Sequence, residues 1–223
     1  MAGSTAYTVF WIYQATPEWR RLSEETRARA RQEFIGALEH AGDASVRGVY
    51  STVGFRPDAD LIIWSYAQDA DALQRFAVQL RQTTLGGLLT QTQAYLGIAG
   101  GSQYDPSHGP AFMKGIPPRR YLSVYPFTKT PDWFLLPFEE RRRLMRVHGE
   151  LGQEYPTILT NTVNSFGIQD QEFIVALEDD DPGVLVEMVQ RLRGAEVRRY
   201  TQVDTPIYLG RLLAPDEALC QLG

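Results

Sequence analysis

The alternation of apolar and polar residues predicts strands and helices in an order that the chain runs through twice. Each half opens with a strand of β-branched and aromatic residues, predicted over Tyr7–Tyr13 and Tyr121–Phe127. Each then continues with a charge-rich helix that begins at a proline, predicted over Pro17–Ala41 and Pro137–Tyr155. Both halves go on with two strands, a second helix and a final strand.

The remaining elements complete the same order in each half. The pattern predicts strands near Ser45–Phe55 and Leu61–Tyr66, a helix from Asp69 and a strand ending at Gly97, and later strands near Thr162–Ile168 and Phe173–Leu177, a helix over Gly183–Arg193 and a strand ending at Gly210. A βαββαβ order is typical of the ferredoxin-like unit, in which both helices cover one face of an antiparallel sheet. The predicted fold class is therefore α+β.

Short matches between the halves support an internal duplication. The sequence Thr16-Pro17-Glu18-Trp19 returns as Thr130-Pro131-Asp132-Trp133, and Tyr95-Leu96-Gly97 returns as Tyr208-Leu209-Gly210. We predict two fused ferredoxin-like halves that form a dimeric α+β barrel-type structure. The first half is predicted over residues 1–99 and the second over 120–223, with a Gly/Pro-rich linker over 100–119 between them.

Composition excludes several classes of function. With 22 Lys and Arg against 27 Asp and Glu, the 223-residue chain has a formal net charge of −5 and no basic excess to neutralise nucleic-acid phosphates. The single cysteine, Cys220, excludes an internal disulfide and a multi-cysteine metal centre. The sequence shows no secretory signal pattern and no apolar run of about 18 residues. We therefore expect a cytoplasmic protein without a membrane span.

The three histidines lie in different settings. His40 is near the predicted end of a helix, where capping or solvation explains it, and His108 lies in the predicted linker. His148 is on the apolar face of its helix, because Leu144 and Leu151 are at helical spacing from it. His148 is either a hydrogen-bonded core histidine or a ligand, and spacing alone favours the first.

Two glycines beside His148 favour a ligand. Gly149 and Gly152 each weaken the helix by roughly 1 kcal/mol relative to alanine, which is explained if something large, such as a planar macrocycle, approaches it closely. The duplication aligns Phe34 with His148 and Trp11 with Tyr125, so only the second half has the polar pair. This indicates a single site in that half, and drift between the repeats is the alternative.

Other features leave simpler interpretations open. Tyr125 shares a strand face with Lys129, where a ligand carboxylate would meet a cation, yet the pattern alone favours a core tyrosine and a solvated lysine. The chain has no P-loop, no dinucleotide-binding glycine pattern, no HExxH and no GxSxG motif. Residue patterns alone therefore predict a site without naming its chemistry.

One long stretch resembles a known family. It begins with YLSVYPFTK at Tyr121–Lys129 and continues with DWFLLPFEERRRLMRVHG at Asp132–Gly149. This set of motifs resembles the chlorite dismutase superfamily and, within it, the actinobacterial type of coproheme decarboxylase. The resemblance covers nearly the whole chain, and its specific part is residues 104–167.

The resemblance implies roles for eight residues. His148 would be the proximal ligand of the iron in coproheme or haem b, and Tyr125 the redox-active tyrosine. His108 would be the distal base that takes a proton from peroxide. The other implied residues support the reaction near the propionates or line the pocket: Lys129, Trp133, Met145, Tyr104 and Thr205. Many members carry arginine where this chain has Lys129.

The implied activity is the hydrogen peroxide-dependent conversion of iron-coproporphyrin III into haem b. It would proceed by two oxidative decarboxylations, at propionates 2 and 4, through a tyrosyl radical. The resemblance also implies a homopentamer and a transient contact with coproporphyrin ferrochelatase. A chlorite dismutase or haem peroxidase on the same fold is the alternative, although no residue clearly matches the arginine of chlorite chemistry. A haem carrier without catalysis is a third.

Overall fold

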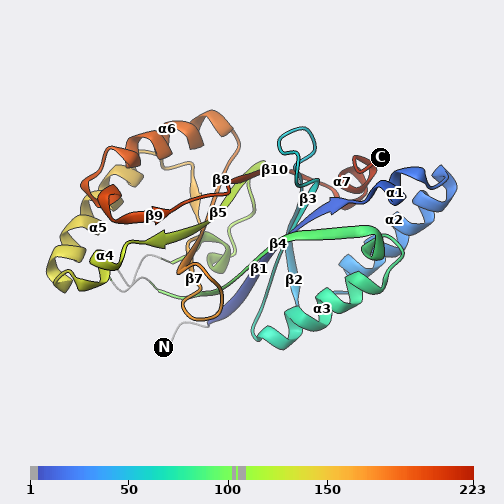
Figure 1. Cartoon of the computed structure of the whole chain (residues 1–223), viewed down its shortest axis with the longest axis horizontal. Helices are drawn as coiled ribbons and strands as arrows, with labels where there is room; N and C mark the ends of the chain where they lie inside the picture. Colours follow the sequence, from blue (N-terminus) through green and yellow to red (C-terminus); the bar gives the residue numbers. More distant parts are fainter. Residues whose placement is uncertain (1–4, 102–103, 105–108) are drawn as a thin grey trace. The chain divides into compact units, whose positions relative to one another are not determined.

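The computed structural model describes residues 5–101, 104 and 109–223 (Figure 1). The chain forms two compact units. The C-terminal unit contains Ala99–Tyr208, and the N-terminal unit contains the residues up to Ile98 together with Leu209–Gly223. The last segment of the chain therefore packs with the N-terminal unit, although it follows the C-terminal unit in sequence. None of the helices described is both long and apolar enough to cross a membrane.

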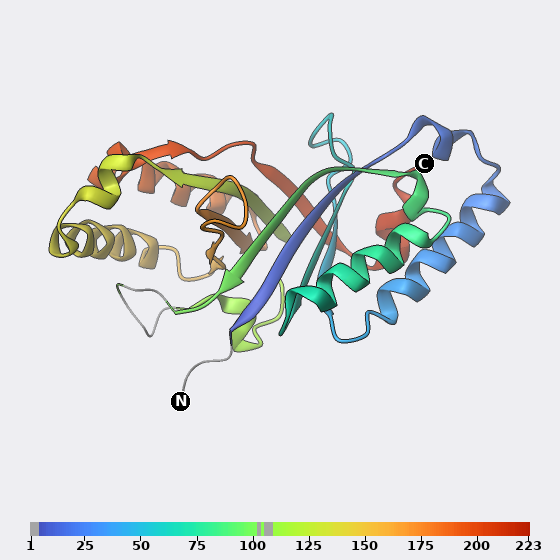
Figure 2. The ribbon, with the colours of Figure 1, turned by 60° about the horizontal axis from the view of Figure 1, so that its bottom comes forward.

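The N-terminal unit is an antiparallel sheet with helices against one face. Its strands are β1 (Ala6–Ala15), β2 (Ser45–Ser51), β3 (Leu61–Ala67), β4 (Leu89–Ala99) and β10 (Tyr208–Leu213). Strand β3 pairs with β1 and β2, and β2 pairs with β10. The helices are α1 (Pro17–Arg21), α2 (Glu24–Glu39), α3 (Ala70–Gln82) and α7 (Pro215–Cys220), with a 3₁₀ turn η1 (Gly86–Leu88). Figure 2 shows α2 and α3 on the same side of these strands.

A buried core joins these helices to the sheet. Trp11 of β1, Phe34 of α2 and Phe76 of α3 belong to one cluster of buried apolar side chains, and the rings of Trp11 and Phe76 lie 5.7 Å apart. Side chains of alternate residues in a strand point to one face, so Trp11 lies on the face of β1 that packs in the cluster with these helices. Phe34 thus fills, in this unit, the helix position that the duplication aligns with His148.

The C-terminal unit has the same kinds of element. Its strands are β5 (Tyr121–Lys129), β6 (Leu159–Thr160), β7 (Val163–Asn164), β8 (Phe173–Asp179) and β9 (Thr201–Val203). Strand β8 pairs antiparallel with β5, β6 and β7, and β5 also pairs with β9. The helices are α4 (Pro131–Leu135), α5 (Phe138–Gln153) and α6 (Pro182–Arg193), with 3₁₀ turns η2 (Ala111–Lys114) and η3 (Glu196–Tyr200). The predicted α+β class is confirmed.

Local sequence breaks two of the predicted elements. The helix expected over Pro17–Ala41 divides into α1 and α2, because Leu22 is extended and the Ser23 side chain caps α2 by accepting from the backbone N–H of Thr26. In the second half, Leu136 is extended before Pro137, a residue that disfavours helix in its predecessor, so α5 begins close to the predicted Pro137, and the short helix α4 before it is an addition to the predicted elements. The strand expected over Thr162–Ile168 is only the two residues of β7.

A buried polar network attaches part of the predicted linker to the sheet. The side chain of Asn161 accepts from the backbone N–H of Phe112 at 2.9 Å and donates to the Glu178 carboxylate at 3.0 Å. The same carboxylate accepts from the backbone N–H of Arg119 at 2.9 Å. Asn161 and Glu178 are fully buried. These bonds hold η2 and the start of β5 against β8, so the described end of the linker is ordered by its contacts.

Candidate functional site

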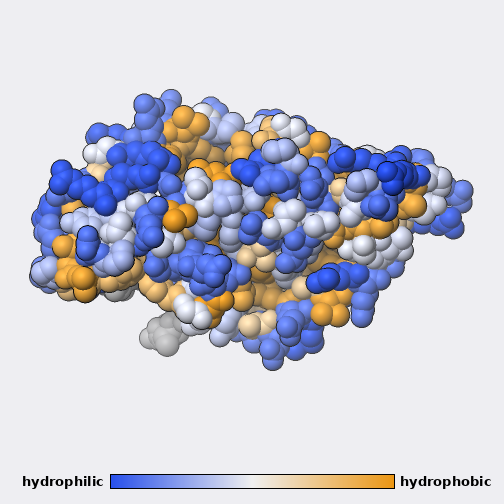
Figure 3. Space-filling model, viewed as in Figure 1, coloured by the Kyte–Doolittle hydropathy of each residue, from blue (hydrophilic) through white to orange (hydrophobic). Residues whose placement is uncertain are grey.

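A cavity of about 1730 Å³ lies in the C-terminal unit. Helices α5 and α6 and strands β5 and β8 all contribute to its wall. Its apolar lining includes Phe127, Phe134, Met145, Phe166, Phe173, Val175, Leu177, Met188, Val189 and Leu192. Figure 3 shows mainly hydrophilic residues on the outside of the helices of this unit, interrupted by small apolar areas. A large hollow with an apolar wall and convergent polar groups is the usual form of a site for an organic ligand.

Six of the eight predicted site residues line this cavity. They are Tyr104, Tyr125, Lys129, Trp133, Met145 and His148. Thr205 is exposed and lies outside the lining, to which its neighbour Asp204 belongs. His108 lies outside the described residues, so its role stays a prediction.

His148 presents a neutral imidazole at the cavity wall. Burial, with a smaller contribution from the Lys129 ammonium, lowers the pKa of the ring to about 4. Its Nδ1 atom is enclosed, and no hydrogen-bond partner for it occurs within the described part of the chain. Enclosed polar atoms in proteins nearly always have a partner. A neutral ring with an unsatisfied nitrogen suits coordination of a metal, in which the second nitrogen is held by a further group.

Two glycines leave the helix next to His148 flat. Gly149 and Gly152 line the cavity, and a Cβ built at either position would meet no heavy atom within 4 Å. Protein packing therefore does not require glycine at either place. Since both residues weaken α5 relative to alanine, the open space beside them is explained by a planar ligand lying against the helix.

The cavity suits a metal that takes a single ligand from the protein. Across residues 5–101, 104 and 109–223, no three His, Cys, Asp or Glu side chains are grouped so that they would hold a bare metal ion. An iron that is already chelated by a porphyrin needs only an axial ligand from the protein, such as one histidine. His148, the flat helix face and the size of the cavity together fit a metalloporphyrin.

Tyr125 is a protonated phenol in the part of the wall formed by β5. It lies in β5, where it pairs with Val175 of β8. Burial, and then the Asp204 carboxylate, raise the pKa of Tyr125 to about 12, although Arg193 and Arg198 oppose this. At physiological pH the phenol therefore keeps its hydrogen, which an oxidant can remove together with an electron.

Lys129 is a buried cation at the end of β5. Only 7% of its surface is exposed, and its Nζ lies 4.3 Å from the ring centroid of Trp133 and 5.2 Å from that of Phe127. Burial, and then the Arg198 guanidinium, lower the pKa of Lys129 to about 8, while the Glu172 carboxylate raises it. Charge is expensive in such surroundings, so a ligand carboxylate that pairs with this ammonium gains more here than it would in water.

A pair of arginines that no sequence pattern indicated, Arg193 and Arg198, also lines the cavity. The carboxylate of Asp204 accepts from Arg193 at 2.9 Å and from Arg198 at 2.8 Å, in both cases at Oδ2. Arg193 ends α6 and Arg198 lies in η3, so the cluster forms only when these elements fold together. Two guanidiniums share one carboxylate, which leaves an excess of positive charge beside Tyr125. The sequence offered only Lys129 as a cation for an acidic ligand.

The Asp204 cluster predicts a measurable change in Tyr125. Replacing Asp204 by asparagine removes the charge that raises the pKa of the phenol and leaves both guanidiniums unneutralised. The pKa of Tyr125 is therefore expected to fall from its value of about 12, as followed by NMR of ring-labelled tyrosine. Asp170→Asn removes an equal charge from an exposed position and should leave Tyr125 unchanged. An unchanged or higher pKa in Asp204→Asn would contradict this electrostatic assignment.

Aromatic rings form the end of the cavity near Trp133. Trp133 is 2% exposed, and its ring meets that of Tyr104 edge-on at 6.4 Å. Tyr104 also stacks on Phe138, with ring centroids 5.8 Å apart. Burial raises the pKa of Tyr104, and the charge of Arg141 lowers it. Tyr104 and Trp133, which are far apart in sequence, thus belong to one wall.

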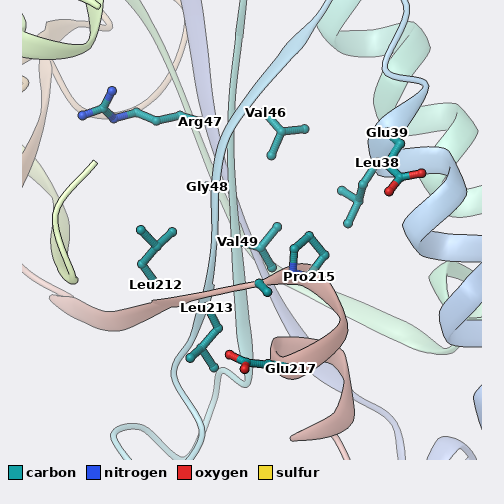
Figure 4. A pocket seen from close by; sticks show the side chains of 11 residues that line it. Leu38, Glu39, Val46, Arg47, Gly48, Val49, Leu212, Leu213, Pro215 and Glu217 are labelled. Carbon is teal, nitrogen blue, oxygen red and sulfur yellow. The ribbon is translucent and has the colours of Figure 1, made fainter. Parts of the chain in front are cut away.

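A second, smaller hollow of about 570 Å³ lies in the N-terminal unit (Figure 4). It is lined by Leu38, Glu39, Val46, Arg47, Gly48, Val49, Leu212, Leu213, Ala214, Pro215 and Glu217. Arg47 extends away from Leu38 and Pro215, and its guanidinium lies 4.8 Å from the ring centroid of Trp64. None of its lining residues is a histidine, tyrosine or cysteine. The residues suited to redox or metal chemistry gather in the larger cavity.

The chain is similar to known proteins over most of its length. A family model described as chlorite dismutase matches residues 15–213. The chain is 33% identical over 219 residues to the coproheme decarboxylase of Mycolicibacterium smegmatis, covering 97% of this chain and 94% of that protein. It is also 30% identical to a protein of Haloquadratum walsbyi provisionally named as heme-binding, covering 93% of this chain and 43% of that protein.

Solved structures show the same fold. The chlorite dismutase of Candidatus Nitrospira defluvii in complex with imidazole is 26% identical to this chain, with a TM-score of 0.89. The match covers 99% of this chain and 95% of that one. The family model and the relative in Mycolicibacterium smegmatis both span nearly the full length. The chain therefore belongs to the chlorite dismutase family.

Proposed function

We propose that the protein is a hydrogen peroxide-dependent coproheme decarboxylase, which converts iron-coproporphyrin III into haem b. The observation that carries the proposal is the cavity that brings His148, Tyr125 and a set of cationic side chains together. The proposal is further supported by the full-length similarity to a coproheme decarboxylase at 33% identity. On this view the macrocycle is both the substrate and the redox centre.

His148 is the residue proposed to hold the iron. Its neutral imidazole offers a lone pair at physiological pH, and the unpartnered Nδ1 is consistent with a ring that gains a partner when the site is filled. Gly149 and Gly152 leave room for the porphyrin plane against α5. Met145 is proposed to pack against the ring from the same helix.

The carboxylates of the substrate require cations, and the wall supplies several. Lys129, Arg193 and Arg198 line the cavity on the side of Tyr125, and Tyr104 and Trp133 line it beside Lys129. Charge-assisted hydrogen bonds from these groups are expected to orient the propionates. Lys129 offers a point charge in place of the fork of an arginine, so it fixes the position of a carboxylate less strictly than arginine would. We also propose a contact between a propionate and Thr205.

The reaction is balanced by one peroxide for each propionate. A propionate loses carbon dioxide, one proton and two electrons and becomes a vinyl group, while hydrogen peroxide takes up two electrons and two protons and becomes two waters. The iron macrocycle supplies the oxidising power when it is bound. Tyr125 gives up its phenolic hydrogen as a hydrogen atom and, as a radical, takes one from the β-carbon of a propionate. Propionates 2 and 4 are the proposed sites, and His108 is the proposed base for peroxide.

Several further features rest on family membership. Two ferredoxin-like halves and a dimeric α+β barrel-type arrangement are proposed, supported by the strand order β4-β1-β3-β2 in the N-terminal unit. We also propose a homopentamer, a location in the cytoplasm and a transient contact with coproporphyrin ferrochelatase. We further propose that the half at 120–223 binds the haem, which is supported by a cavity lined mostly by residues of this half up to Asp204.

Peroxide titration of the protein loaded with ferric coproheme tests this function. Mass spectrometry of the extracted pigment is expected to show the loss of one and then two carboxyl groups, with haem b as the end product. Samples without peroxide should retain coproheme. A loaded protein that never converts coproheme would contradict the proposal. Oxygen release from chlorite, in a protein that fails to decarboxylate, would instead favour a chlorite dismutase, and stable loading without either reaction would favour a haem carrier.

A further inference from the structure

A tyrosine outside the cavity contacts the cavity wall through Trp133. The ring of Tyr200 lies 5.7 Å from that of Trp133, at an interplanar angle of 53°. Tyr200 is half-buried and does not line the cavity, whereas Trp133 does. The two rings thus connect the inside of the site with a residue that reaches solvent elsewhere.

Backbone contacts fix this pair. Trp133 lies in α4, and Tyr200 is the last residue of η3. The backbone N–H of Thr130, just before α4, donates to the carbonyl of Tyr200 at 3.0 Å. Both rings pack in one small apolar cluster that also contains Leu144 and Val197. The contact is therefore part of the packed structure of the unit and does not depend on an exposed loop.

Indole and phenol are among the side chains most easily oxidised by one electron under neutral conditions, and rings in contact exchange electrons readily. The Lys129 ammonium influences whether the oxidised state lies on Trp133 or on Tyr200. Its Nζ lies 4.3 Å from the Trp133 centroid, an attractive contact while the indole is neutral. The attraction becomes repulsion when the indole loses an electron. The oxidised state is thereby destabilised at Trp133 and favoured at Tyr200, which becomes a neutral radical on giving its proton to water.

Tyr104 does not provide a path for electron transfer out of the cavity. Its ring meets Trp133 at 6.4 Å, but Tyr104 itself lines the cavity and stacks on Phe138. Oxidation that moved to Tyr104 would stay within the site. Of the two tyrosines that contact Trp133 in the described structure, only Tyr200 leads away from the cavity.

We propose that Trp133 and Tyr200 form an electron-transfer path that gives the protein a second activity, the peroxide-driven oxidation of small phenols at its surface. The path rests on the proposed function, because peroxide must be reduced in the cavity. Tyr200 passes an electron to oxidised Trp133, its O–H bond breaks and the proton goes to water. A phenol then gives a hydrogen atom to Tyr200 and restores it. Two phenols and one peroxide yield two phenoxyl radicals and two waters.

This path would act when no propionate remains to be oxidised. Peroxide that reacts with the product-loaded protein would otherwise damage the residues of the cavity. Tyr125 oxidises the propionates, whereas the Trp133–Tyr200 pair carries the remaining oxidising equivalents to the surface. The test therefore uses the protein loaded with haem b, in which decarboxylation is complete.

The experiment locates the radical. Protein loaded with haem b is mixed with peroxide and a nitroso spin trap, digested and analysed by mass spectrometry, and guaiacol oxidation is followed in parallel. The wild type is expected to carry the adduct on Tyr200. Tyr200→Phe should lose both the adduct and most guaiacol oxidation while still converting coproheme. Trp133→Phe should lose the Tyr200 adduct. Tyr121→Phe, which alters another half-buried tyrosine outside the cavity lining, should retain it.

Each outcome supports or overturns the path. A Tyr200 adduct that persists in Trp133→Phe with an intact haem spectrum overturns it, as does a wild type labelled only elsewhere. If Trp133→Phe fails to load, Tyr200→Phe decides the matter, because unchanged guaiacol oxidation in that variant also overturns the path. Labelling of Tyr200 in a protein that does not convert coproheme would support the path and contradict the decarboxylase function. Conversion of coproheme without labelling of Tyr200 would support the decarboxylase function and contradict the path.

Discussion

Replacement of His148 by alanine is expected to weaken binding of ferric coproheme more than about 100-fold, because even the loss of a group that merely supports a metal ligand costs up to that factor. The neutral imidazole at the wall of the cavity is the proposed axial ligand, and in the alanine variant water would take its place on the iron. Titration followed at the Soret band measures both the affinity and the change of ligand. The carboxylate contacts should still allow weak binding of the ring.

His40→Ala is a matched control for this experiment. His40 follows α2 and its Nδ1 lies 2.8 Å from the carbonyl oxygen of Gly36 at an exposed position, so its loss should leave the spectrum and affinity unchanged. Addition of imidazole to His148→Ala is expected to restore part of the wild-type spectrum by occupying the vacated place. A variant that keeps the wild-type Soret band without added imidazole would refute His148 as the ligand.

Tyr125→Phe is expected to bind coproheme as well as the wild type does and to lose decarboxylation by roughly a thousandfold, equivalent to about 4 kcal/mol in the barrier. Phenylalanine preserves the ring in β5 but has no phenolic hydrogen to exchange with the propionate. Product analysis after peroxide titration measures the rate of carboxyl loss, and freeze-quench EPR reports the tyrosyl radical. Both signals should disappear together.

Tyr121→Phe provides the comparison within the same strand. Tyr121 is half-buried in β5, on the strand face that also carries Tyr125, and it does not line the cavity. Its variant should convert coproheme at the wild-type rate. Near-normal conversion by Tyr125→Phe would show that the hydrogen atom is taken by another group and would remove Tyr125 from the mechanism. Loss of binding in Tyr125→Phe would point to a role in positioning.

The His148→Ala and Tyr125→Phe variants separate coproheme binding from decarboxylation, although both depend on the same cavity. His148 comes from α5 and Tyr125 from β5, and the cations Arg193 and Arg198 come from α6 and η3. Asp204 holds the two arginines in place, so the charge of the wall depends on a carboxylate that itself carries the opposite sign. A substrate with several carboxylates would compete with Asp204 for these guanidiniums. The pairing of its carboxylates with these guanidiniums is consistent with the acidic porphyrin that we propose as substrate.

Periodicity in the sequence predicted most of the elements correctly, because the spacing of apolar residues depends on local geometry alone. Strands Tyr121–Lys129 and Phe173–Asp179 and helix α6 lie close to their predicted ranges. The helix start predicted at Pro137 agrees with α5, whereas the boundary at Leu22 was missed, since a single capping serine decides it. Boundaries of this kind depend on one side chain and have little effect on the pattern.

For the site, the sequence by itself determined the residue types and the helix face of His148. Helical spacing put His148 toward the interior, and the motif around Tyr125 suggested the family. The tertiary structure decided that Tyr104, Tyr125, Trp133 and His148 line one cavity. It also supplied the Asp204 cluster and the contact between Trp133 and Tyr200. Such groupings join residues far apart in the chain, and only packing brings them together, so no local pattern records them.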